Sequence, residues 1–188
     1  YQNILSDIVD DFEEKQLTCV LLEKKIYYIT SGEERYVKNG FHLHFPYIFL
    51  SKIDQSIHLI PRVKKQVKDN NVFADLGIED SSSVIDSCVG TVPWLLYGSR
   101  KNEDSDPYLL TKIYNNKLQE ISKEEAFNDY KIFDEEEEPV NINDDIDFYI
   151  PRILSIIPYG RDTNDLKENL EYLSRKTVKK NKLPNKQA

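Results

Sequence analysis

The stretch Asn39–Pro46, with the sequence NGFHLHFP, predicts the turn and the second strand of a β-hairpin. Asn-Gly is the strongest short hairpin signal because both turn residues adopt a positive φ. Residues 35–38 are then expected to form the incoming strand. After the turn, apolar residues alternate with His42 and His44, which places the two histidines on one face of the sheet and the apolar side chains on the other. Pro46 should end the strand because it lacks the N–H that a ladder requires.

The histidine face allows two interpretations. A half-exposed sheet needs polar residues on its outward side, and imidazole is one of several choices for such a position. Alternatively, His42 and His44 belong to a functional site, where imidazole binds anions or transfers protons. The alternation by itself is compatible with both interpretations.

The composition indicates a single domain with enough apolar residues to bury a core. The chain has 188 residues, a formal charge of -8 and no methionine, which favours a fragment or a processed product. No apolar run is long enough to span a bilayer, and no secretory signal is visible. Cys19 and Cys88 lie in apolar stretches without metal-ligand spacing, so we expect buried free thiols in a reducing compartment. The negative charge argues against generic coating of nucleic acid and still allows a local basic site.

The hydrophobic pattern predicts an α+β fold, with a small mixed or antiparallel sheet packed on helices. The clearest predicted helix covers 51–68, where Ser51 is a suitable N-cap with Asp54 three residues on, and where Pro61 should kink or split the helix. A short helix should begin at Ser122, with Glu125 as its capping partner. The remaining predicted helices cover 2–16 and 164–174, and the predicted strands cover 17–22, 25–30, 84–89, 93–97 and 107–114.

Acidic residues dominate 134–147, and they divide the predicted chain into three parts. Residues 1–130 are expected to form the α+β domain, 131–147 a solvated acidic linker, and 148–188 a polar C-terminal extension with a helix and a basic tail. Asp145 and Asp147 have a D-x-D spacing that could bind a divalent ion on a strand. In a linker of this composition, solvated carboxylates are the simpler interpretation.

Asp86 interrupts the predicted apolar strand at 84–89. A buried carboxylate is costly unless it is paired or binds a metal, so Asp86 is either a functional group or a residue that caps or turns the end of the strand. Further on, Ser99, Arg100 and Lys101 follow Gly98 directly after an apolar run. Backbone N–H groups, a hydroxyl and two cations could converge there on an anion, typically phosphate. Many strand ends look similar, so this signal alone is weak.

The order of these features resembles the archaeo-eukaryotic-type primase (primase-polymerase) domain at the front of the primase-helicases of large nucleocytoplasmic DNA viruses. The series is a Gly-Phe-His strand, a long helix, an Ile-Asp strand, and then the segments PWLLYGSRK and PYLLT. The resemblance covers roughly residues 17–121. Its most specific pieces are GFH at 40–42 and LYGSRK at 96–101. It implies an RRM-like sheet and template-directed nucleotidyl transfer.

The resemblance also implies roles for individual residues. His42 matches the histidine that contacts the phosphates of the incoming nucleotide, and His44 is the fallback. Asp86 matches the late carboxylate of the divalent-metal site, which would hold Mg²⁺ or Mn²⁺. Ser99, Arg100 and Lys101 match the segment that binds the triphosphate of the nucleoside triphosphate substrate. The implied partners are a single-stranded DNA template and a downstream superfamily 3-type helicase region, inside an infected cell and without a membrane.

The sequence departs from the family pattern in one important respect. The acidic pair of such primases should lie on a strand well upstream of the histidine, and no D-x-D or D-x-E strand precedes His42. No Gly-x-x-x-x-Gly-Lys-Ser/Thr helicase loop occurs in the sequence either. We therefore expect the C-terminal part of a primase domain. The alternative is a non-catalytic nucleic-acid-binding or scaffold piece that keeps the fold without the chemistry.

Overall fold

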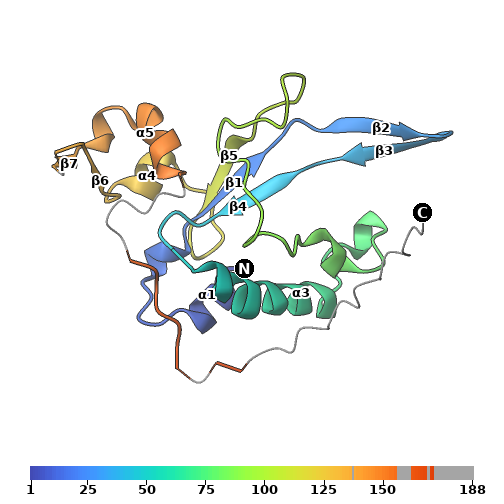
Figure 1. Ribbon diagram of the computed structural model, residues 1–188, viewed down its shortest axis with the longest axis horizontal. Coiled ribbons are helices and arrows are strands. Elements are labelled where there is room, and N and C mark those ends of the chain that lie inside the picture. The colour runs from blue at the N-terminus through green and yellow to red at the C-terminus, as the bar shows by residue number, and fades with distance from the viewer. Residues whose placement is uncertain (137, 156–161, 169, 172–188) are drawn as a thin grey trace, which may run out of the picture.

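The fold is organised around a three-stranded antiparallel sheet, as a computed structural model shows. It describes residues 1–136, 138–155, 162–168 and 170–171. The strand order is β4-β1-β5, with β1 at Cys19–Glu23, β4 at Phe41–His44 and β5 at Leu109–Tyr114. Helices lie on both sides of this sheet (Figure 1). The expected α+β class with a small antiparallel sheet is therefore confirmed. In the described part of the chain, no helix is long and apolar enough to cross a bilayer.

A protruding two-stranded hairpin replaces the one predicted at Asn39-Gly40. Strand β2 (Tyr27–Ser31) pairs with β3 (Glu34–Lys38), and the turn lies at Gly32, whose φ is +65°. The predicted turn was wrong: neither Asn39 nor Gly40 has a positive φ. The reason is that β4 pairs with β1 instead of β3, so Asn39-Gly40 carries the chain from one ladder to the next. The hairpin projects away from the rest of the molecule (Figure 1).

The predicted long helix is present, with the expected interruption. Its parts are α2 (Lys52–Asp54), a π-helical turn (Gln55–Leu59) and α3 (Ile60–Asp69). Ser51 caps the start, and its hydroxyl accepts a hydrogen bond from the N–H of Asp54 at 3.1 Å. Pro61 lies in the first turn of α3, where its missing N–H is tolerated. The backbone absorbs the proline by widening into a π-turn just before it.

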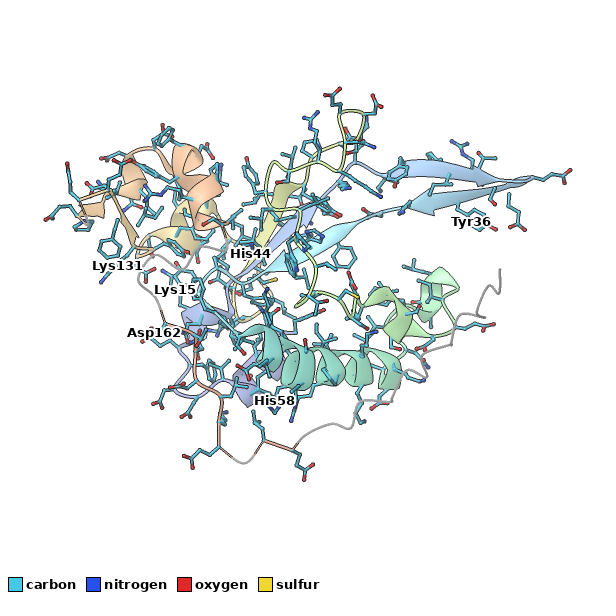
Figure 2. The ribbon with its side chains drawn as sticks, in the orientation of Figure 1. Lys15, Tyr36, His44, His58, Lys131 and Asp162 are labelled. Carbon is cyan, nitrogen blue, oxygen red and sulfur yellow. The ribbon has the colours of Figure 1, made fainter. Side chains whose placement is uncertain are left out.

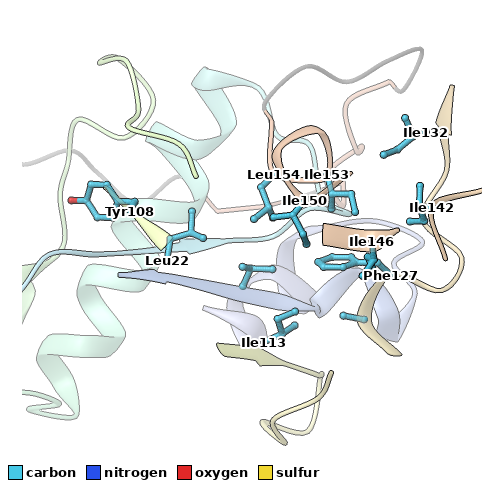
Figure 3. Packing of buried hydrophobic residues seen from close by; sticks show 12 residues of the cluster. Leu22, Tyr108, Ile113, Phe127, Ile132, Ile142, Ile146, Ile150, Ile153 and Leu154 are labelled. Atoms are coloured by element: carbon cyan, nitrogen blue, oxygen red, sulfur yellow. The ribbon is translucent and has the colours of Figure 1, made fainter. Parts of the chain in front are cut away.

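Two apolar clusters hold the sheet between the helices. The first joins the sheet to α4 (Lys123–Phe127) and α5 (Ile146–Ile153), and Figure 3 shows its packing. Its buried members are Val20, Leu22, Tyr108, Ile113, Ala126, Phe127, Ile132, Ile142, Ile146, Ile150, Ile153 and Leu154. The second joins α1 (Gln2–Ile8) to α3 and includes Ile4, Leu5, Ile8, Val9, Leu17, Leu59, Ile60, Val63 and Ile85. The sheet is thus covered on both of its faces.

The first predicted helix is present but shorter than expected, and the last one is wrong over residues 164–168, for a shared reason. Helix α1 ends at Ile8 instead of continuing to residue 16, and residues 164–168 are not helical. Val9 is extended and forms an antiparallel bridge with Leu166. The N–H of Lys167 donates to the carbonyl of Ile8, and the N–H of Asp10 donates to the carbonyl of Asp165, both at 2.9 Å. This long-range pairing competes with helix in both segments. The rest of the predicted 164–174 helix, at 169 and 172–174, and the basic tail lie outside the described residues.

Two predicted strands in the middle of the chain were also wrong. Residues 81–84 form a short 3₁₀ helix (Ser81–Val84), and turns follow to residue 92 in place of a strand. Gly90 packs so closely on the helix start that a Cβ there would lie 3.0 Å from the carbonyl oxygen of Lys52. Residues 93–96 are irregular, because β5 takes β1 as its partner. Other short 3₁₀ helices lie at Glu14–Leu17, Ala74–Leu76 and Ile142–Asp144.

The acidic stretch contains residues that pack in the core. Strands β6 (Ile132–Phe133) and β7 (Pro139–Val140) pair with each other, and Ile142 is buried in the first cluster. The predicted helix at Ser122 is confirmed as α4, whose cap is a hydrogen bond from the N–H of Glu125 to the Ser122 hydroxyl at 3.1 Å. The boundaries proposed for the three parts of the chain stay a prediction.

Candidate functional site

His42 lies between two aromatic side chains that come from distant parts of the sequence. Its ring stacks on Tyr108 with centroids 4.1 Å apart and planes 17° apart. Trp94 approaches the ring at 5.2 Å and a 45° tilt, and its indole N–H donates to the carbonyl of Val89 at 2.8 Å. Three segments thus meet here: strand β4, the irregular stretch before residue 97, and the start of β5. The two rings fix the orientation of the imidazole.

The histidine side of the sheet is a buried side. His42 is the register partner of Leu22, and His44 is the partner of Val20. Partners in an antiparallel ladder point to the same face, so the histidines share that face with two fully buried residues. The alternation was predicted correctly, but the interpretation of the histidine face as the outward, solvated side of a half-exposed sheet was wrong. The reason is that α4 and α5 pack on the face of the sheet that would otherwise be solvated. Figure 2 shows His44 in the sheet.

Burial shifts both histidines toward the neutral form. Burial lowers the pKa of His42. A hydrogen bond that the ring donates to the backbone of Leu95 and the charge of Asp86 oppose this effect, and the charge of Lys24 adds to it. Burial, together with the neighbouring His42, lowers the pKa of His44 to about 4. Within the described residues, the Nδ1 atoms of both rings are buried without a hydrogen-bond partner. At neutral pH, both imidazoles are therefore uncharged.

Gly40 and Lys24 complete the surroundings of Tyr108. The ammonium of Lys24 lies over the Tyr108 ring, 4.6 Å from its centroid. A Cβ on Gly40 would come within 3.1 Å of the Tyr108 hydroxyl. Position 40 thus favours glycine because of the close approach of the Tyr108 ring rather than because of a turn conformation. In the Gly-Phe-His sequence, Gly40 thus leaves room for the Tyr108 hydroxyl, and His42, two residues later, stacks on the Tyr108 ring.

We expect Gly40→Ala to cost about 1 kcal/mol of unfolding free energy, because the new methyl group must push against the Tyr108 hydroxyl. In a Tyr108→Phe background the same change should cost almost nothing, since the oxygen that the methyl meets is gone. Urea unfolding of the four proteins in this double-mutant cycle gives the coupling energy directly. Equal costs in both backgrounds would contradict the contact.

The Ser99–Pro107 loop is anchored at its base to Tyr108. The N–H of Gly98 donates to the Tyr108 carbonyl at 2.7 Å, and the N–H of Tyr108 donates to the Ser99 carbonyl at 3.1 Å. Gly98 has a φ of +75°, which directs the chain into this loop. The structure therefore brings Ser99 next to the residue on which His42 stacks. Arg100 and Lys101 follow on the exposed part of the loop, without an ion pair to any described residue.

Asp86 lies in an exposed turn instead of a buried strand. Its carboxylate accepts a hydrogen bond from the N–H of Cys88 at 2.7 Å, which is the turn-residue alternative left open by the sequence. It is still close enough to His42 for its charge to act on that imidazole. Cys88 is exposed, so the expectation of two buried thiols holds only for Cys19.

Asp145 and Asp147, the D-x-D pair of the acidic stretch, both have partners that give them structural roles. Asp145 caps α5 by accepting from the N–H of Phe148 at 3.2 Å, and Asp147 forms an ion pair with Lys123. Among the described residues, no group of three or more His, Cys, Asp or Glu side chains could hold a metal ion. The carboxylates at 145 and 147 therefore do not form a metal site with these residues.

The sequence did not reveal the role of Tyr108, Trp94 or Lys24. Each was visible as a residue type, and Trp94 stands out as the sole tryptophan of the chain. Their convergence depends on the pairing of β1 with both β4 and β5, which no local pattern encodes. The one usable signal was the closeness of PYLLT to LYGSRK, because it places an aromatic residue after the cationic loop.

Comparison with known proteins shows the family to which the chain belongs. The family model "C962R protein N-terminal AEP domain" matches residues 1–114, which is more than half of the chain. This chain belongs to that family. AEP stands for archaeo-eukaryotic primase, so the resemblance seen in the sequence motifs is confirmed. The matched region ends with β5 and includes His42, Asp86 and the Ser99–Lys101 segment.

Two viral relatives of this AEP-domain chain carry helicase names. "Putative helicase 121R" of Invertebrate iridescent virus 3 is 35% identical over 178 residues, which cover 91% of this chain and 18% of the relative. "Putative helicase 184R" of Invertebrate iridescent virus 6 is 36% identical over 170 residues, covering 84% and 17%. The chain thus spans less than a fifth of the length of either relative. No solved structure matches it.

Proposed function

We propose that this AEP domain supplies the nucleotide-binding side of a viral DNA primase that performs template-directed nucleotidyl transfer. The observation that carries the proposal is the shared anchor of two motifs: Tyr108 stacks on His42 and binds the base of the Ser99–Pro107 loop. An imidazole and two cations that form no ion pair with any described residue thereby extend from one support. A nucleoside triphosphate needs such a combination of fixed positive charge and hydrogen-bond donors.

Each residue has a distinct role in this proposal. Arg100 binds phosphate oxygens through its guanidinium fork, and Lys101 adds a point charge. Ser99 donates its hydroxyl, and His42 contacts a phosphate and takes up a proton as it does so. Tyr108 is a positioning residue, since it holds both His42 and the loop without touching the nucleotide.

The proposal also bears on divalent metal ions. Mg²⁺ or Mn²⁺ in a nucleotidyl-transfer site would stabilise charge on the triphosphate, and such sites use several carboxylates. The described residues do not fit a complete site, because Asp86 stands alone and is engaged with the N–H of Cys88. Asp86 could contribute one ligand only if further carboxylates joined it from outside the described residues.

The partners and location are proposed on the same basis. Relatives with helicase names favour a primase-helicase that acts on a single-stranded DNA template during replication in an infected cell. A second candidate is a non-catalytic nucleic-acid-binding or scaffold module. The lack of a metal-binding cluster among the described residues favours this candidate. The primase candidate predicts that nucleotide binding depends on His42 and Arg100, and the non-catalytic candidate predicts that it does not.

The test is titration of a fluorescent nucleoside triphosphate, with and without Mn²⁺. We expect Arg100→Ala to weaken binding about 10-fold or more, because a charge-assisted hydrogen bond contributes about 1.5–3 kcal/mol. The matched control is Lys117→Ala, which removes an exposed cation at the opposite end of β5 and should leave binding unchanged. A folded wild type that does not bind the triphosphate would contradict the proposal, as would equal binding by the Arg100 variant.

The pH profile of the same titration isolates His42. Lys24, Asp86, His44 and Tyr108 surround its ring, and its pKa is below the usual 6.5. Affinity should therefore rise as the pH falls below 6.5, because protonation adds a positive charge next to the phosphates. His42→Ala should remove this rise while leaving the Arg100 contribution in place.

A further inference from the structure

The β2–β3 hairpin exposes an unusual amount of aromatic and aliphatic surface. We call residues 27–38 the arm. Every residue of its two strands is exposed, and it extends beyond the sheet with Tyr36 well out along it (Figure 2). Exposed apolar surface of this kind usually marks an interaction site. Its large exposed side chains are Tyr27, Tyr28, Ile29, Tyr36 and Val37.

The two faces of the arm differ in whether a cation covers their aromatic rings. The register pairs Tyr27 with Lys38 and Ile29 with Tyr36 on one face, which we call the Tyr27 face. The opposite face carries Tyr28, whose ring is already covered by the guanidinium of Arg35 at 3.8 Å. Among the described residues, no cation lies over the rings of the Tyr27 face, where Tyr27 and Tyr36 are 44% and 50% exposed. The hydroxyl of Tyr36 donates a hydrogen bond to the carboxylate of Glu34 at the tip, which leaves the ring face itself open.

The Tyr27 face is continuous with the candidate site. Tyr27 follows Lys24 by three residues, and the Lys24 ammonium lies over Tyr108. Burial raises the pKa of Tyr108, and Tyr27 is near enough to raise it further. Rings and ammonium groups thus follow one another from His42 through Tyr108 and Lys24 to Tyr27 and Lys38.

The charge of this region is opposite to that of the whole chain. Residues 24–38 hold four basic and two acidic side chains, whereas the chain carries a net charge of -8. Both acids, Glu33 and Glu34, lie at the tip of the arm, so the base of the arm is purely basic. An anionic partner with flat apolar groups therefore fits the base of the Tyr27 face better than an apolar protein surface does.

We propose that the Tyr27 face of the arm binds single-stranded nucleic acid and guides it toward His42. Bases stack on Tyr27 and Tyr36, while Lys38 and Lys24 contact phosphates. Aromatic rings interleaved with cations are the usual means of holding a single strand without sequence preference. The inference rests on the proposed function, since it makes the arm the template path into the same nucleotide site.

The test measures binding of a fluorescent deoxythymidine oligonucleotide, without metal, to the full 188-residue chain. Tyr27→Ala should weaken binding about 5-fold or more, and Tyr27→Phe should retain it, because the ring supplies the stacking. Tyr28→Ala is the matched control on the opposite face and should have little effect. Lys38→Gln should reduce the slope of log affinity against log salt by about 0.7, the value for one lost phosphate contact. The arm is exposed, so these variants should all fold.

The outcomes separate this inference from the proposed function. Loss of oligonucleotide affinity in Tyr27→Ala with unchanged triphosphate binding supports the arm as a strand-binding surface. Unchanged affinity in Tyr27→Ala, or equal losses in Tyr27→Ala and Tyr28→Ala, would overturn it while leaving the triphosphate result untouched. A wild type that binds no oligonucleotide at low salt would overturn it too. If Tyr27→Ala changes the mass of the protein in solution but not its oligonucleotide affinity, the arm is a protein contact and the inference is wrong.

Discussion

Phe127→Ala should lower the free energy of unfolding by about 3–5 kcal/mol, the range for removing a buried aromatic ring. Phe127 is fully buried at the end of α4 and lies in the cluster that joins the sheet to α5. Its ring also meets Tyr130 edge-on, with centroids 6.0 Å apart. Figure 3 shows the ring within this cluster, so its loss would leave a cavity there. Urea unfolding at pH 7 measures the change.

Phe148→Ala is the matched control for this core substitution. Phe148 lies on α5, but it is 71% exposed, and its ring meets Tyr149 edge-on with centroids 5.0 Å apart. The same chemical change there should cost less than about 1 kcal/mol. Similar losses for the two variants would show that the first cluster does not depend on the packing of α4 and α5 against the sheet.

Acidification should destabilise the protein through His44 by about 3 kcal/mol between pH 6.5 and pH 4. Burial lowers the pKa of His44 to about 4 in the folded chain, and the neighbouring His42 adds to the effect. In the unfolded chain the ring titrates near its ordinary value of 6.5. Between these two values the unfolded state binds a proton that the folded state does not, so stability is present above pH 6.5 and is lost as the pH falls toward 4.

His44→Phe tests this pH dependence without emptying the site. A phenyl ring fills most of the same space and has no ionisable group, and it also removes a buried Nδ1 that has no partner among the described residues. The variant should lose less stability than the wild type between pH 7 and pH 4.5, and the difference isolates His44 from the carboxylates. Parallel stability curves for the two proteins would contradict the buried, neutral ring.

The correct local predictions rest on short-range chemistry. Ser51 and Ser122 cap helices because a hydroxyl three residues before an N–H satisfies it wherever the chain folds. Pro61 interrupts its helix because the missing N–H acts within one turn. The motif around His42 indicated the primase family because those residues are tied together by spacing along the chain.

The incorrect predictions share a different cause, which is competition from distant partners. Asn39-Gly40 looked like a tight turn, but β4 pairs with β1, and β3 pairs with β2. Asp86 looked like a buried carboxylate, yet Gly90 packs against the start of α2, and residues 81–92 turn instead of extending. The segment around Leu166 had a helical pattern, but it pairs with Val9.

The sequence alone therefore determined the fold class, the capped helices, the alternation of β4 and the family to which the chain belongs. Only the tertiary structure decided that the histidine face is covered, that Tyr108 joins His42 to the Ser99–Pro107 loop, and that the arm stands free. Caps and alternation follow from hydrogen bonds and side-chain directions within a few residues, so they can be read locally. The site and the arm follow from which strands pair across the chain, and that choice depends on burial summed over the whole molecule.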